Sequence, residues 1–161
     1  MLYRTHLAFG LAVGVAVWQW GGWKLDLLGG IIFFGIVAFG SLFPDLDHPK
    51  SKLGHKIPAV SHLFHWIFGH RGFLHSIFFI VLLGAIVILL TSSRYGFPLM
   101  VGLFAHVLSD CLTTEGVNLI HPFHQLSVKG FIETGSLAEL IVFFGSLAYI
   151  AFTFFGTLRF F

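Results

Sequence analysis

The chain has 161 residues, of which 57% are hydrophobic and only 10% are charged. Soluble domains carry about 25% charged residues, so this composition favours a membrane protein. The formal net charge of +2 gives no basis for nucleic-acid binding, and the single cysteine, Cys111, excludes an intrachain disulfide or a thiolate-rich zinc cluster. Ten histidines favour imidazole and oxygen ligands for any bound metal.

Apolar runs predict an all-α, polytopic transmembrane bundle of about five spans in a single integral membrane domain, 1–161. The runs cover about 6–20, 27–43, 74–92, 97–112 and 136–158. A straight span needs roughly 20 residues, so the short first and fourth runs suffice only if protein shelters their polar ends. The first run ends in tryptophans typical of a membrane interface, which favours a retained helix over a signal peptide. A soluble bundle with a very apolar core is the alternative, which the lack of charged helix faces disfavours.

Lysine and arginine are unequally divided between the two faces that five spans define. The larger set comprises Arg4, Lys50, Lys52, Lys56, Arg71 and Lys129, and the smaller set Lys24, Arg94 and Arg159. Positively charged segments stay in the cytoplasm, so we expect an inner-membrane protein with its N-terminus inside. The long loops 49–73 and 113–135 lie on that face, and the amphipathic stretch 52–68 is expected to lie at the interface.

Potential metal ligands gather at the same face. His6 begins the first span, His70 and His75 begin the third, and the others end the second and fourth: Asp45, Asp47, His48, His106 and Asp110. Imidazole and carboxylate suit divalent zinc, manganese or iron. Ionisable groups at a membrane segment are costly unless they are paired, solvated or metal-bound. The sequence therefore predicts a metal site at the cytoplasmic end of the bundle.

Each residue also has a structural interpretation. His106 and Asp110 share a helix face at i and i+4, where they either reach one ion or form a structural pair. His6 can be an interfacial histidine, and Asp47 can cap the turn before Pro49. Arg71 is interpreted either as a clamp for an anionic substrate or as a topological arginine. Surface or supporting roles are both open for four further residues, Glu115, His121, His124 and Glu139.

Several motifs carry a resemblance to a known family. They are Thr5-His6, Phe43-Pro44-Asp45-Leu46-Asp47-His48-Pro49, Gly69-His70-Arg71-Gly72-Phe73-Leu74-His75-Ser76, Ala105-His106-Val107-Leu108-Ser109-Asp110 and Glu115-Gly116-Val117. In order and spacing, residues 5 to about 124 resemble the bacterial membrane-bound metal-dependent hydrolases, the YdjM-like family also described as LexA-binding inner-membrane hydrolases. A distant likeness to zinc phospholipase C suggests phosphoester chemistry by analogy. Leu74 stands where the family usually has threonine.

The resulting functional hypothesis is hydrolysis by a metal-activated water at one or two ions, with zinc favoured over manganese or iron. Arg71 would hold an anionic substrate, and Asp47 or His48 would act as general base. A site at headgroup depth implies an amphiphilic phosphorylated substrate from the bilayer. The alternatives are a metal transporter or sensor without hydrolytic activity, and an adaptor that binds a soluble protein through loop 49–73. No His-Glu-x-x-His or Gly-x-Ser-x-Gly motif occurs.

Overall fold

The fold was analysed in a computed structural model, which describes residues 1–48, 51, 54–68, 72–124 and 126–158. The α-helices in this part of the chain are α1 (Tyr3–Gly21), α2 (Leu27–Gly40), α3 (Pro58–Phe68), α4 (Ile77–Leu90), α5 (Ser93–Cys111) and α6 (Leu137–Leu158). Three short 3-10 helices, η1 (Pro44–Asp47), η2 (Gly54–Lys56) and η3 (Phe73–His75), lie between them. The five predicted apolar runs therefore coincide with α1, α2, α4, α5 and α6.

Local sequence signals set several of these helix ends. The Asp26 carboxylate accepts the Gly29 backbone N–H at 2.9 Å and begins α2, and the Ser76 hydroxyl accepts that of Phe79 at 3.1 Å and begins α4. Both are N-caps, which satisfy backbone donors that a helix start leaves without partners. Gly22, with φ of 64°, ends α1 in the left-handed conformation that glycine adopts without strain.

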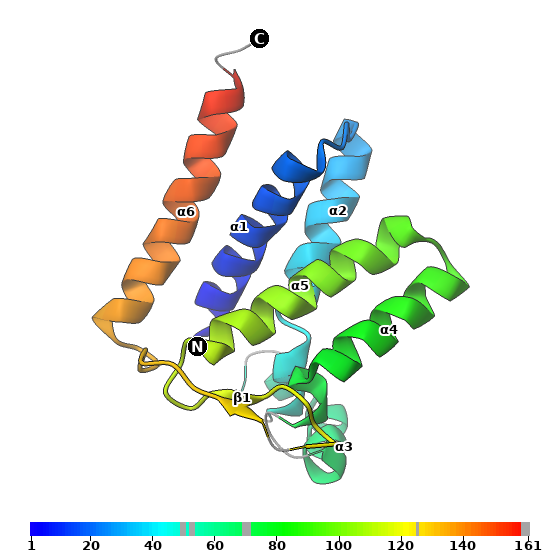
Figure 1. The fold of residues 1–161 in the computed structure, drawn as a ribbon, viewed down its shortest axis with the longest axis vertical. Coiled ribbons are helices and arrows are strands. Elements are labelled where there is room, and N and C mark those ends of the chain that lie inside the picture. Colours follow the sequence, from blue (N-terminus) through cyan, green and yellow to red (C-terminus); the bar gives the residue numbers. More distant parts are fainter. Residues whose placement is uncertain (49–50, 52–53, 69–71, 125, 159–161) are drawn as a thin grey trace.

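Helix α5 is the centre of the arrangement, because it packs against α1, α2 and α4. Helix α6 packs beside α1 at the edge of the bundle (Figure 1). The crossing of α2 and α5 is close: a Cβ atom on Gly40 would lie 2.8 Å from the Leu99 carbonyl oxygen and 3.2 Å from Gly102 Cα. Small residues permit such contact between membrane helices, and the ends of α2 and α5 meet as a result.

Two helical segments, Leu27–Asp47 and Leu137–Gly156, are long and apolar enough to cross a membrane, judged by length and composition. Helix α4 is apolar but shorter, and α1 and α5 have 19 residues each with a less apolar composition. The mostly helical architecture expected from the sequence is confirmed, whereas the number of spans stays a prediction.

The two long loops contain a helix, in the stretch expected to form an interfacial helix or loop, and a strand pair that the hydropathy pattern did not predict. Helix α3 occupies much of the predicted interfacial stretch and packs against η1. Strands β1 (Val117–Asn118) and β2 (Ser127–Val128) form an antiparallel pair with Val117 opposite Val128. The Ile77 N–H donates to the Leu119 carbonyl at 3.0 Å, which ties this hairpin to the start of α4. Figure 1 shows α3 and β1 at the end of the bundle where the chain begins.

Candidate metal centre

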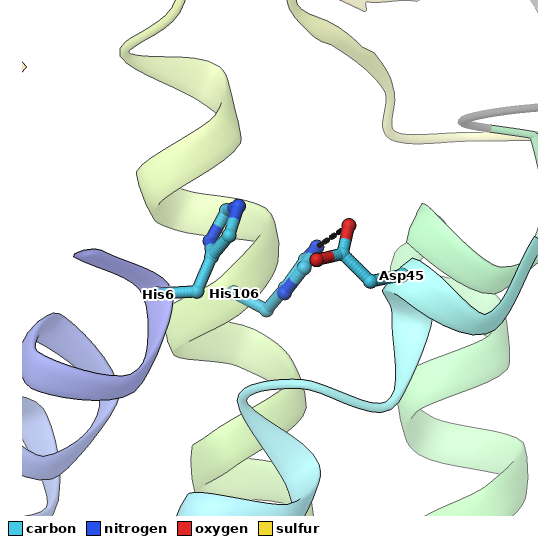
Figure 2. Close-up of side chains that lie close together, drawn as sticks. All are labelled: His6, Asp45 and His106. Atoms are coloured by element: carbon cyan, nitrogen blue, oxygen red, sulfur yellow. Dashed lines mark ion pairs between the residues drawn. The ribbon is translucent and has the colours of Figure 1, made fainter. Parts of the chain in front are cut away.

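Side chains from α1, η1, η3 and α5 converge at the end of the bundle near the N-terminus. Figure 2 shows His6 and His106 reaching from their helices toward Asp45 on η1. Pro44 at the first position of η1 has the backbone angle that a helix start needs. A 3-10 helix has three residues per turn, so side chains two positions apart diverge by about 120°. Asp45 accordingly faces His106, whereas Asp47 faces His75.

His75, His106 and Asp110 form the tighter of two groups whose ligand atoms could hold an ion. The two Nε2 atoms lie 3.2 Å apart, and each lies 3.6 Å from Asp110 Oδ2. All three side chains are buried. Ligand atoms bound at about 2.0–2.1 Å to a tetrahedral zinc are ~3.3–3.4 Å from one another. The spacing of these three atoms thus fits a single small divalent cation.

The second group comprises His6, Asp45 and His106. The rings of His6 and His106 stack with centroids 4.0 Å apart and planes at 14°, and His106 Nε2 lies 3.9 Å from Asp45 Oδ1. His6 Nε2 lies 3.4 Å from Asp110 Oδ1, whereas His75 and His106 face the other oxygen of this carboxylate, Oδ2. The Asp45 side chain is 16% exposed, which makes it the most accessible of the five residues in the two groups.

The proton positions on the three imidazoles follow from their oxygen partners. His106 Nδ1 donates to the Ser41 carbonyl at 2.8 Å, because a carbonyl oxygen only accepts. The Ser109 hydroxyl donates to the His106 carbonyl and therefore accepts from His6 Nδ1, both at 2.8 Å. His75 Nδ1 lies 3.2 Å from Asp47 Oδ2, which also only accepts. His6 and His106 therefore present Nε2 as a lone pair toward the centre of the cluster, and His75 does the same in the tautomer that carries its proton on Nδ1, facing Asp47.

The electrostatic balance of the cluster favours a cation. His75 Nε2 and His106 Nε2 lie 3.2 Å apart, a distance at which a proton or a cation between them is favourable, and the buried carboxylates of Asp47 and Asp110 add negative charge. The Met1 ammonium lies 3.1 Å from Asp110 Oδ1 and supplies one positive charge at the edge of the group. Imidazoles whose Nδ1 atoms face oxygen acceptors are the usual arrangement around protein-bound metal. The donor set fits a divalent metal.

Most of the ligands predicted from sequence lie in this cluster. His6, Asp45, His75, His106 and Asp110 form the two groups. Asp47 lies behind His75, where it faces Nδ1 and orients the ring. His48, at the end of η1, belongs to neither group among the described residues. His70, Arg71, Lys50 and Lys52 lie outside the described residues.

Some contributors escaped the sequence analysis. The Ser41 carbonyl is a backbone atom from another helix, and no side-chain motif signals it. Ser109 could have been found, because it shares the His106 face of α5 at i+3. Glu139, considered earlier for a supporting role, is buried: it accepts the backbone N–H of Leu2 and of Gly135, each at 2.6 Å. The bond to Leu2 joins α6 to the residue just before α1, the helix that carries His6. Glu115 and His124 are exposed in the second loop.

The fold and the cluster define a class: a helical membrane protein with a buried histidine–aspartate centre at one end of its bundle. The profile of the YdjM inner membrane protein family matches residues 1–159, and the chain belongs to this family. The YdjM family expected from the motifs is thereby confirmed, and an inner-membrane location is supported, whereas the hydrolase activity and the likeness to zinc phospholipase C stay predictions.

Individual relatives agree with the assignment. YvsG of Bacillus subtilis (strain 168) is 30% identical over 147 residues, which cover 90% of this chain and 89% of YvsG. The inner membrane protein YdjM of Escherichia coli (strain K12) is 38% identical over 87 residues, which cover 50% of this chain and 44% of YdjM. YdjM of Shigella flexneri gives the same values. No solved structure matches the chain.

Proposed function

We propose that this chain is a membrane-embedded, metal-dependent hydrolase that cleaves a phosphoester of an amphiphilic substrate. One observation carries the proposal: the Nε2 atoms of three histidines and the carboxylates of Asp45 and Asp110 converge at one end of the bundle, at distances that suit metal ligands. Bound there, a divalent cation would supply Lewis acidity and activate water at neutral pH. Zinc suits the ligand spacing best, and manganese and iron share the donor preference.

The arrangement supports one ion or two. His106 has only Nε2 to offer, because Nδ1 is bonded to Ser41, so the two groups compete for one nitrogen. Asp110, by contrast, directs Oδ1 to His6 and Oδ2 to His75 and His106. A carboxylate with its oxygens on two sides can bridge two ions. Asp110 would therefore be the carboxylate available to both groups if two ions were bound, with the Met1 ammonium displaced from Oδ1.

The protein groups around this site have separable roles in the proposed reaction. Asp47 is engaged with His75 and holds that ring in place. His48, partly exposed at the end of η1, is the better general base of the two residues considered from sequence. Arg71 keeps its proposed role as the anion clamp. The position of the cluster at the end of apolar helices, with Asp45 partly exposed, suits a substrate with its head at the interface and its tail in lipid.

The decisive experiment measures metal and activity together. Protein purified in detergent should retain about one or two equivalents of zinc, manganese or iron by elemental analysis. It should also release phosphate from an isoprenyl phosphate or phospholipid. His106→Ala and Asp110→Asn should each lose both properties.

His55→Ala is the matched control, because His55 is exposed on η2 and should be dispensable for metal and activity. Unchanged metal content in His106→Ala would show that the assigned centre is wrong. Full metal occupancy without phosphate release from any of these substrates would favour the metal sensor or transporter instead.

A further inference from the structure

A cavity lies at the opposite end of the bundle from the candidate metal centre. Its volume is about 420 Å³, and its walls come from the α1–α2 connection, the start of α2, the end of α4 and the start of α5. The lining is mostly aromatic and aliphatic, with Ser93 and Arg94 as its polar members. The proposed hydrolase makes no use of this cavity.

The guanidinium group of Arg94 lies close to Gly29, which has no side chain to block it. A Cβ atom on Gly29 would lie 3.3 Å from Arg94 Nη2 and 2.6 Å from Asp26 Oδ1. Glycine therefore lets the guanidinium group lie close over the first turn of α2. Asp26, whose carboxylate accepts the Gly29 N–H, lies beside the same glycine and keeps its negative charge, but the exposed Arg94 forms no ion pair with it or with any other described residue. The cavity thus presents a cation whose charge is available to a ligand.

The apolar wall beside this cation is fixed by ring packing. Trp23 meets Phe33 edge to face at 5.9 Å between centroids and meets Phe97 at 5.1 Å. The Trp18 indole N–H donates to the Trp23 carbonyl at 3.0 Å, which anchors the connection from α1. Interlocked rings of this kind offer a stable hydrophobic surface.

We propose that this cavity binds an anionic phospholipid, with its phosphate on Arg94 and an acyl chain along Phe33 and Phe97. A guanidinium fork binds phosphate oxygens in pairs. Lys24, exposed between two lining residues, adds positive charge at the rim. Arg94 lies at the end of apolar helices next to Trp23, and arginine and tryptophan are typical of the membrane interface, where lipid headgroups lie. The combination of a single anion contact with a long apolar wall suits a lipid rather than a soluble anion.

The test compares lipids by native mass spectrometry and by thermal unfolding in detergent. Wild-type protein should retain phosphatidylglycerol in preference to phosphatidylcholine, and added phosphatidylglycerol should raise its Tm more. Arg94→Gln should weaken phosphatidylglycerol binding roughly tenfold and remove the preference. Lys129→Gln, which removes an exposed cation at the other end of the molecule, should behave as wild type.

A second variant tests the proposal independently, in case Arg94→Gln does not fold. Ile88→Trp fills the cavity and leaves Arg94 in place, so it should lose the bound lipid while keeping its helical content. Equal retention of both lipids by wild type, or unchanged binding in both variants, would overturn the proposal. Stabilisation by inorganic phosphate equal to that by phosphatidylglycerol would also overturn it, because the apolar wall would then contribute nothing.

Discussion

The carboxylate of Asp47 acts on the candidate centre through His75. It lies 3.2 Å from Nδ1 of that ring and is fully buried, so it favours the tautomer that leaves Nε2 free for a cation. Carboxylate partners of metal-bound histidines typically change metal affinity by about 10- to 100-fold when they are removed. We therefore expect Asp47 to affect metal affinity through the orientation of His75.

We predict that Asp47→Asn weakens zinc binding by about 10- to 100-fold and leaves the fold intact. An amide nitrogen facing His75 Nδ1 cannot accept its proton, and an amide oxygen accepts it less strongly than a carboxylate does. Competition with a chromophoric chelator measures the affinity. Asp26→Asn makes the same chemical change at the far end of the bundle, where asparagine remains a good N-cap, and should not alter zinc binding. Equal affinities in wild type and Asp47→Asn would contradict the orienting role.

Sequence reasoning succeeded best for side chains with local patterns. The i and i+4 spacing of His106 and Asp110 placed both on one helix face, where the structure has them. It could not find the Ser41 carbonyl, which is 65 residues from His106 and contributes through its backbone. Sequence reasoning also could not tell which histidine each aspartate of η1 faces. The turn of η1 directs Asp45 to His106 and Asp47 to His75.

At the scale of helices, the centre depends on how closely α2 and α5 cross. Their contact at Gly40 and Gly102 brings the end of α2 to the face of α5 that carries His106, and the Ser41–His106 bond follows. The crossing is thus a structural condition for the imidazole orientation.

We predict that Gly40→Ala destabilises the protein by about 1–3 kcal/mol, because the new methyl group would overlap the Leu99 carbonyl. Zinc affinity should fall as well, since separation of the helices lengthens the Ser41–His106 contact. Gly35→Ala is the control on the same helix, where a Cβ meets nothing within 4 Å. Thermal unfolding and zinc titration of the two variants provide the measurement. Similar values for both would show that the crossing has no such influence.

The helix positions were predictable because each apolar run is long enough for a helix. N-cap residues, such as Asp26 before α2 and Ser76 before α4, then set where the helix begins. The β1–β2 pair was missed for a physical reason. Strands of two residues are too short to show an alternating pattern, and their pairing joins segments about ten residues apart. The 3-10 turns of η1 and η3, which carry Asp45 and His75, gave no periodic signal either.

For the whole molecule, the open question is which side of the membrane the centre faces. Five crossings would put the two chain ends on opposite sides, and Figure 1 shows the start of α1 and the last turn of α6 at opposite ends of the bundle. The excess of lysine and arginine that the sequence assigns to the face of the N-terminus favours a cytoplasmic position for that end. Lys24 and Lys129, both exposed, lie at the two different ends and report on the orientation.

We predict that a membrane-impermeant maleimide labels Lys24→Cys but not Lys129→Cys in intact cells, each made in a Cys111→Ser background. Permeabilised cells should label both, because both positions are exposed. The charge excess is six against three, so the bias is real but modest, and the opposite labelling pattern would invert the orientation. Labelling of both positions in intact cells would contradict five spans, because an even number of crossings must then separate these sites. Protection of Lys129→Cys alone would place the metal centre, and any substrate it cleaves, at the inner leaflet.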